Sequence, residues 1–222
     1  MKGPVPQSNR GSSSEESIVF VVDDDPIVRG AISSLLLSVG QQAQQYGSAA
    51  ELLQNSLPEV ASCLILDIRL PGLSGLDLQV ELANAGVPIP IIFITGHGDI
   101  PMSVKAMKEG AVDFLAKPFR DQDLLDAVSR ALKRDRKRRD DARDSLDLTA
   151  RFKTLTLREK QTMALVTDGL LNKQIAGKME ISIDTAKIHR GRVMSKMGAK
   201  SLADLVIMAD ALGVRGKPPP ET

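Results

Sequence analysis

The stretch VVDDDPIVR, Val21 to Arg29, places three consecutive aspartates directly after an apolar run that begins at Ile18. Carboxylates crowded within a few ångströms repel one another and raise one another's pKa unless a cation lies among them. The stretch therefore predicts a buried strand whose carboxyl end carries a site for a proton or a hard metal ion.

The composition is typical of a globular protein with room for two domains. The chain has 222 residues, of which 42% are apolar and 26% charged. No apolar run approaches the roughly 20 residues of a membrane span, and residues 1–17 are polar where a signal peptide needs an apolar segment. We therefore expect a cytoplasmic protein with no membrane partner. The single cysteine, Cys63, excludes an internal disulfide and a Cys-based zinc site.

The two halves of the chain carry opposite charge. Residues 18–126 contain 14 acidic and 6 basic side chains, whereas residues 151–222 contain 7 acidic and 13 basic ones. An acidic half suits a bound cation, and a basic half suits a polyanion such as DNA.

Short β-branched apolar runs alternate with helical patterns in the first half, which predicts a parallel sheet with helices on both faces. The expected strands are Ile18–Val22, Cys63–Ile68, Ile89–Thr95 and Asp113–Ala116. The expected helices are Ile27–Val39, Ala49–Leu57, Leu76–Ala83 and Ile100–Glu109. The glutamine-rich segment between Gly40 and Gly47 is poor strand material, so we expect it to form an edge strand.

Polar residues follow the other strands as well as the first. Asp67, Thr95 and Lys117 each stand at or just after the end of an expected strand. In such sheets the functional site lies beyond the carboxyl ends of the strands. The sequence therefore predicts that these three side chains meet the aspartates of the opening stretch.

The motifs VVDDDPIVR, LILDIRLPGLSG, FITGHGD and DFLAKPF, in this order, resemble the receiver domain of bacterial two-component response regulators. The resemblance covers residues 18–130 and implies a doubly wound, five-stranded parallel α/β sheet of the CheY/flavodoxin type. It implies that Asp67 is the phospho-acceptor and that Thr95 and Lys117 assist the transfer. Phe114 matches the aromatic switch position that works with Thr95.

The same resemblance implies a bound Mg²⁺, or Mn²⁺ in its place. Asp24 and Asp67 are expected to be direct ligands, Asp23 to act mainly through water, and Arg69 to lend its backbone carbonyl. Asp67 would take a phosphoryl group from a phosphohistidine while the ion neutralises the crowded oxygens. Asp25 has a different expected role, because Asp before Pro26 is typical of a helix N-cap.

Two other interpretations of this half have less support from the sequence. His97 could act in catalysis, but its loop position without a partner carboxylate favours an exposed side chain. An Asp-nucleophile phosphohydrolase of the haloacid dehalogenase type would also use Mg²⁺ and an aspartyl phosphate. That class needs a second aspartate two residues after the nucleophile, where this chain has Arg69. We therefore expect no enzyme, beyond assistance to the chain's own phosphorylation and dephosphorylation.

A charged helix is predicted between the halves. An amphipathic pattern from Phe119 leads into Lys133–Asp144, where 11 of 12 residues are charged. Acidic and basic residues alternate there, with pairs such as Asp135 and Arg139 four residues apart. A solvated linker helix is favoured over a basic patch for DNA.

The motifs LTLREKQ, GLLNKQIAGKM, TAKIHRGRVMSKMGAKS and LADLV resemble the helix-turn-helix of the LuxR/NarL/FixJ class. The resemblance implies an all-α, four-helix DNA-binding domain whose recognition helix, 182–197, enters the major groove. The expected organisation is a disordered tail 1–17, a receiver 18–130, a helical linker 131–152, a helix-turn-helix domain 153–212 and a flexible tail 213–222.

The helical period separates two sides of residues 182–197. Ala186, Val193 and Met197 form one stripe with His189 on its flank, so this side should pack inward. We expect base contacts from Lys187 and Ile188, which suit guanine acceptors and a thymine methyl. The full set of expected DNA contacts is Lys173, Thr185, Lys187, Ile188, Arg190, Gly191 and Arg192.

Three positions depart from the family pattern. Leu157 replaces a usual proline, Ala186 a usual valine, and Glu180 a usual glycine at the turn before the recognition helix. A residue other than glycine would be strained there if the turn requires a positive φ.

Together the two resemblances imply a phosphorylation-dependent transcriptional regulator, an activator of a two-component system. Its expected partners are a sensor histidine kinase, promoter DNA, RNA polymerase and, once phosphorylated, a second copy of the chain.

Overall fold

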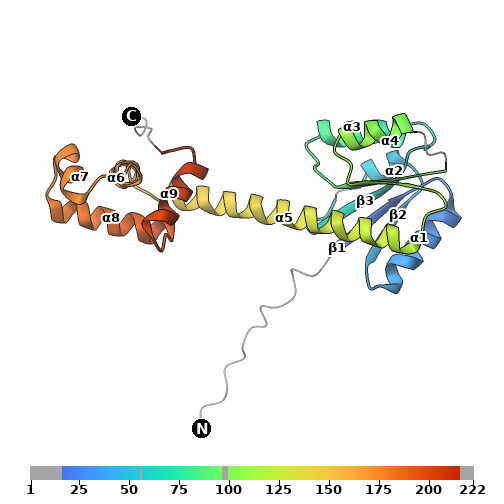
Figure 1. The fold of residues 1–222 in the computed structure, drawn as a ribbon, viewed down its shortest axis with the longest axis horizontal. Coiled ribbons are helices and arrows are strands. Elements are labelled where there is room, and N and C mark those ends of the chain that lie inside the picture. The colour runs from blue at the N-terminus through green and yellow to red at the C-terminus, as the bar shows by residue number, and fades with distance from the viewer. Residues whose placement is uncertain (1–16, 56, 97–99, 216–222) are drawn as a thin grey trace, which may run out of the picture. The chain divides into compact units, whose positions relative to one another are not determined.

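The computed structural model describes residues 17–55, 57–96 and 100–215, and the chain divides into two compact units, residues 1–139 and 140–222. The first unit contains a five-stranded sheet and helices on both of its faces (Figure 1). Its strands are β1 Ser17–Val22, β2 Gln42–Tyr46, β3 Ala61–Asp67, β4 Ile91–Thr95 and β5 Asp113–Ala116. Its helices are α1 Pro26–Ser38, α2 Ala49–Leu53, α3 Gly75–Asn84, α4 Ile100–Lys108 and the start of α5, Asp121–Lys153.

The sheet has the strand order β2-β1-β3-β4-β5, and all of its neighbouring strands are parallel. The predicted fold class is therefore confirmed. The glutamine-rich segment forms the edge strand β2, as expected, with its glutamines exposed or half-buried and Tyr46 buried against the core. A glutamine-rich strand is tolerated there because an edge strand keeps one side in contact with water.

Two separate apolar layers cover the faces of this sheet. Side chains that alternate along β1, such as Val19 and Phe20, enter opposite layers, because successive strand residues point to opposite faces. One layer packs the sheet against α2, α3 and α4, and the other packs it against α1 and α5. With both faces covered, the polar site is confined to the ends of the strands.

Several expected element boundaries differ from those observed, and prolines account for two of the differences. Helix α2 ends at Leu53 rather than Leu57, and the residue before Pro58 is disfavoured in helical conformation. Strand β4 begins at Ile91 rather than Ile89, because Pro90 has no N–H to donate to a ladder and the Ile89 amide donates to the Val87 carbonyl in a turn.

Helix α5 runs unbroken over 33 residues, and its first half packs on the sheet. Buried side chains recur at Leu124, Val128, Leu132 and Asp135, the last with no exposed surface. The interpretation of the charged segment as solvated is therefore wrong for Asp135. This carboxylate accepts hydrogen bonds from the Ser62 amide at the start of β3 and from two arginines of its own helix.

The second unit is helical and has its own core. After the end of α5 it contains α6 Leu157–Thr167, α7 Asn172–Met179, α8 Ile183–Met197 and α9 Leu202–Ala211. The predicted capping box is present, because Thr156 and Glu159 exchange hydrogen bonds at the start of α6. Buried Glu159 also binds Lys196 Nζ of α8 at 2.6 Å. Over the described ranges, no helix has both the length and the apolar character needed to cross a bilayer.

Glu180 ends α7 in the left-handed conformation, with φ of 55°. It is the one residue other than glycine with a positive φ in the described part of the chain. The concern raised by the missing glycine is therefore confirmed: the turn before α8 does require this conformation.

We expect Glu180→Gly to raise the free energy of unfolding of the second unit by about 1 kcal/mol, because glycine adopts this φ without a steric penalty. Protection of the α7 and α8 amides from hydrogen exchange would measure it. Glu180→Ala is the matched control and should give no gain, because alanine keeps the Cβ. An equal gain from both variants would assign the effect to the lost charge instead.

Candidate phosphorylation site and nucleic-acid interface

Three carboxylates gather at the carboxyl edge of the sheet. Asp23 and Asp24 follow β1, and Asp67 ends β3, the neighbouring strand. One oxygen from each of the three lies within 4.8 Å of the others. Asp23 and Asp67 are buried, whereas Asp24 is exposed, so the cluster opens to solvent on the Asp24 side.

Backbone amides hold the two buried carboxylates in place. The Asp25 amide donates to Asp23 Oδ1 at 2.9 Å, and the Arg69 amide donates to Asp67 Oδ1 at 3.0 Å. Asp25 itself turns away from the cluster and caps α1 through the Ile27 amide at 2.8 Å, as predicted. Asp23 and Asp24 therefore belong to the carboxylate cluster, whereas Asp25 belongs to the start of α1.

The ammonium group of Lys117 joins the cluster from the end of β5. Its Nζ lies 2.5 Å from Asp23 Oδ2 and 2.7 Å from Asp67 Oδ2. Burial alone would lower the pKa of Lys117, but the hydrogen bonds to both carboxylates outweigh burial and raise it. Burial raises the pKa of Asp23 more than Lys117 lowers it. Removing the ammonium would therefore leave two buried carboxylates without their cationic partner.

Thr95 and Phe114 lie on the two neighbouring strands β4 and β5. Thr95 ends β4 and is buried, and its carbonyl accepts a hydrogen bond from the Lys117 amide at 2.7 Å. Phe114 is half-buried and packs at the edge of the layer that contains α4. The structure thus brings Thr95 to the same edge as the carboxylates, with Phe114 beside the α4 layer.

The three carboxylates suit a hard divalent cation. Asp23, Asp24 and Asp67 offer oxygen donors, and such donor sets favour Mg²⁺ or Mn²⁺. Arg69 is exposed and follows Asp67 by two residues, so its backbone is next to the cluster. His97 lies outside the described residues.

Two residues that support the site were not predicted. Arg29, the last residue of the opening stretch, is half-buried and its Nη1 donates to the Asp23 carbonyl at 2.5 Å. Gly75 lies so close to β3 that a Cβ there would stand 2.3 Å from the Asp67 carbonyl oxygen. The second glycine of the motif LPGLSG, Gly75, was the available signal, since glycine permits close backbone approach.

The second unit presents the expected outward side of α8. Ala186, Val193 and Met197 are fully buried, which confirms the predicted inward stripe. The exposed residues of the expected DNA set are Lys173, Lys187, Ile188, Gly191 and Arg192. These exposed positions include three cations, so this side could meet phosphates and base edges.

The remaining residues of that set are partly engaged within the protein. Thr185 is half-buried, and its hydroxyl lies 2.8 Å from the Ser182 hydroxyl at the helix start. Arg190 is half-buried, and its Nη1 donates to Asn172 Oδ1 at the start of α7. His189, which was expected on the flank of the inward stripe and not in this set, is half-buried. Its Nδ1 is buried with no hydrogen-bond partner among the described residues.

Comparison with known proteins agrees with both halves. Residues 19–129 match the response regulator receiver domain, and residues 153–209 match the bacterial regulatory proteins of the luxR family. Nodulation protein W of Bradyrhizobium diazoefficiens is 56% identical over 208 residues, which cover 94% of this chain and 92% of that protein. The chain belongs to the response regulators. It joins a receiver to a LuxR-type DNA-binding domain. The comparisons therefore give no support to the alternative of a phosphohydrolase of the haloacid dehalogenase type.

Solved structures of response regulators give the same result. The response regulator StyR aligns with a TM-score of 0.81 and 45% identity, covering 88% of this chain and 98% of that one. Full-length FixJ from B. japonicum aligns with a TM-score of 0.54 and 36% identity over 90% of this chain and 98% of that one. This response regulator is therefore a homologue of transcriptional regulators rather than a classical enzyme.

Proposed function

We propose that this response regulator is a transcriptional activator switched by phosphorylation of Asp67, with a sensor histidine kinase as the phosphoryl donor. The observation that carries the proposal is the constellation of Asp67 with Lys117 Nζ at 2.7 Å and the acidic pair Asp23 and Asp24 beside it. A buried carboxylate with a cation at hydrogen-bond distance is suited to attack on a phosphoryl group.

In the transfer, an Asp67 oxygen forms a bond to phosphorus while the bond from phosphorus to the donor histidine nitrogen breaks and its electron pair returns to the imidazole. Lys117 supplies a point charge to a phosphoryl oxygen, and the Thr95 hydroxyl donates a hydrogen bond to another. A divalent ion held by Asp23, Asp24, Asp67 and the Arg69 carbonyl would neutralise the crowded oxygens. The same groups would later assist attack by water on the acyl phosphate.

An apolar groove beside the site supports a protein donor. A cavity of about 570 Å³ lies between α1 and the segment that follows Lys117, lined by Ile27, Leu35 and Phe119 among others. Ile27 is 79% exposed although it stands only three residues from Asp24. We propose that the kinase packs its phosphohistidine-bearing helix here, which would exclude water from the reacting atoms.

Acetyl phosphate tests the proposal without a kinase. Incubation of the full chain with Mg²⁺ and acetyl phosphate should produce one slower band on phosphate-affinity electrophoresis, and chelation of the metal should abolish it. Absence of the band at saturating Mg²⁺ would overturn the assignment of this edge as a phosphorylation site.

Phosphorylation should convert the receiver to a dimer. The phosphoryl group would draw the Thr95 hydroxyl toward it and leave space for the half-buried Phe114 ring, which would remodel the surface of α4 and β5. Phosphorylation can shift the equilibrium between the original and the remodelled receiver only by the difference between its interaction free energies with these two states. Sedimentation velocity at micromolar concentration should show a monomer without a phosphoryl mimic and a dimer with it. An unchanged mass would contradict the dimer.

The phosphorylated dimer would bind promoter DNA through α8 and recruit RNA polymerase. Lys187 is exposed, and its ion pair with Asp184, at 3.2 Å, is exposed as well, so its ammonium is available for a base edge. Arg192 is exposed on the same helix and suits a phosphate. Arg190 is proposed to reach a phosphate by leaving Asn172, and Lys173, Thr185, Ile188 and Gly191 complete the surface.

Lys187→Ala should weaken binding to the specific site by roughly 1–3 kcal/mol and relax preference at one base pair. Arg192→Ala should instead weaken binding to all sequences alike and reduce the salt slope by about one unit. Fluorescence anisotropy with specific and random duplexes at several salt concentrations separates these effects. An unchanged ratio of specific to random binding in Lys187→Ala, together with lost discrimination in a folded His189→Ala variant, would reverse the proposed orientation of α8.

A further inference from the structure

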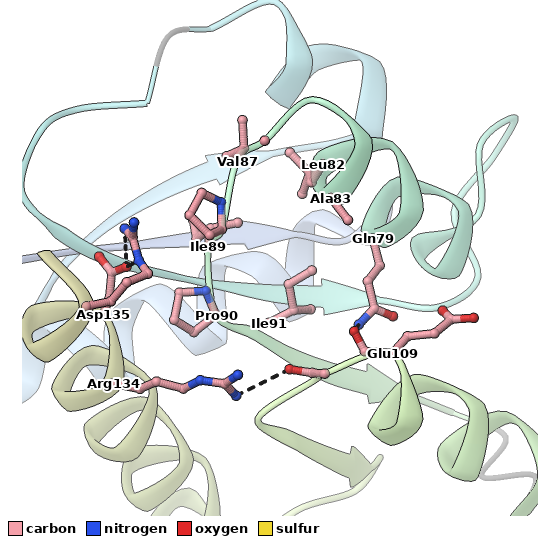
Figure 2. A pocket seen from close by; sticks show the side chains of 14 residues that line it. Gln79, Leu82, Ala83, Val87, Ile89, Pro90, Ile91, Glu109, Arg134 and Asp135 are labelled. Carbon is pink, nitrogen blue, oxygen red and sulfur yellow. Dashed lines mark hydrogen bonds and ion pairs between the residues drawn. The ribbon is translucent and has the colours of Figure 1, made fainter. Parts of the chain in front are cut away.

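A cavity of about 560 Å³ opens at the amino end of the sheet, away from the carboxylates. It is formed by the second half of α3, residues 86–90 before β4, the turn at Gly110, and one face of α5 (Figure 2). Ile91 lines the cavity and Thr95 ends the same strand at the phosphorylation site, so the two sites are about 13 Å apart along β4. The phosphorylation chemistry therefore makes no use of this cavity.

Cationic groups lie on the α5 side of the cavity. Arg134 is exposed, and its Nη1 donates to the Gly110 carbonyl at 3.3 Å. A dashed line marks this hydrogen bond in Figure 2. Among the described residues no carboxylate pairs with Arg134. Arg138 is half-buried and donates two hydrogen bonds to Asp135, which a further arginine, Arg139, also binds. The charge of Arg134 is therefore left for an anion.

The opposite wall carries a buried acceptor without a donor. Gln79 of α3 is 6% exposed, and its Nε2 donates to the carbonyls of Glu109 at 3.1 Å and Ala106 at 3.5 Å. These bonds fix the orientation of the amide, and Oε1 has no partner in the described residues. A buried acceptor left unsatisfied is unfavourable, because it has lost its hydrogen bonds to water without gaining others. A water in the cavity that donates to Oε1 would satisfy this acceptor.

Apolar side chains form most of the remaining lining, to which the exposed acidic residue Glu109 also contributes. Leu82 and Ala83 project from α3, and Val87, Pro88 and Pro90 come from the segment before β4. The volume is within the range of small-molecule sites, which combine apolar walls with a few polar groups. One open guanidinium beside apolar walls selects for an anion with an apolar body rather than for a polyanion.

We propose that this cavity is a binding site for a small organic acid, a monocarboxylate whose apolar body lies along Val87 and Pro90. The carboxylate accepts hydrogen bonds from the Arg134 guanidinium, whose planar fork matches two carboxylate oxygens. Because Arg134 and Arg138 belong to α5, the ligand would bridge this helix to the segment that enters β4. The inference is independent of phosphorylation at Asp67.

Titration of the full, isotopically labelled chain with 4-phenylbutyrate, octanoate or benzoate tests the site. At least one of these acids should produce saturable shifts at the amides of Gly86, Val87 and Gly110. The matching neutral amide, such as 4-phenylbutyramide, should bind at least about tenfold more weakly, as expected for loss of a charge-assisted hydrogen bond. Arg134→Gln should lose the same factor for the acid.

Lys133→Gln is the matched control, because it removes the same charge from the neighbouring exposed position, which does not line the cavity. It should leave the affinity within about twofold. Three results would overturn the proposal: no saturable shift with any of the three acids up to about 10 mM, equal binding of acid and amide, or equal losses in Arg134→Gln and Lys133→Gln. Matched melting curves of the two variants would show that both are folded.

Discussion

Asp67→Asn should give a protein that takes up no phosphoryl group from acetyl phosphate, even at saturating Mg²⁺. An amide oxygen is a poor nucleophile toward phosphorus, whereas the carboxylate oxygen can form the acyl phosphate. The substitution keeps the side-chain shape, so the amide oxygen can still accept from the Arg69 amide, which lies 3.0 Å from Oδ1 in the native chain. Phosphate-affinity electrophoresis measures the loss as the disappearance of the slower band.

Asp25→Asn is the matched control for this experiment. Asp25 belongs to the same run of three aspartates, but its carboxylate caps α1 rather than facing Asp67. Asparagine is an equally good N-cap, so the variant should fold and be phosphorylated like the native chain. Equal phosphorylation of Asp67→Asn and the native chain would show that another side chain accepts the group. Loss of phosphorylation in both variants would show that removing one negative charge from this region is enough to prevent the reaction.

The arrangement of the candidate site could be predicted from the sequence because it depends on strand ends. Parallel strands of a covered sheet direct their carboxyl ends to one edge, so residues that follow β1, β3, β4 and β5 must meet. Asp67 and Lys117 are 50 residues apart, yet each needed only its own strand to be recognised. The apolar runs were sufficient for that recognition even where their first residues were misplaced, as at Ile89.

Contacts that depend on helix orientation could not be predicted. The hydrogen bond from the Ser62 amide to Asp135 joins residues 73 positions apart. The sequence around Asp135 has the alternating charges of a solvated helix, and nothing local marks one aspartate as buried. Arg29 and Gly75 were missed for the same reason, since each is defined by a neighbour that the fold brings close. A period in hydrophobicity identifies an apolar face but does not identify a buried charge on it.

The Asp135 carboxylate has a structural role that a substitution can measure. Its Oδ2 accepts from the Ser62 amide at 3.0 Å and from Arg139 Nε at 2.6 Å, while Oδ1 accepts two bonds from Arg138. Asp135→Ala would leave a buried amide without an acceptor and two partly buried guanidinium groups without their anion. We expect the free energy of unfolding of the receiver to fall by about 3 kcal/mol, the lower end for a broken buried pair, because the arginines can reach water.

Tyrosine fluorescence reports this loss for the receiver alone, because Tyr46 of β2 is the only tyrosine and the chain has no tryptophan. Asp140→Ala is the control, since Asp140 is an exposed aspartate of the same helix and should cost no more than about 0.5 kcal/mol. If urea denaturation gave equal midpoints for the two variants, the Asp135 cluster would contribute no net stability. The apolar side chains Leu124, Val128 and Leu132 would then be sufficient to hold α5 on the sheet.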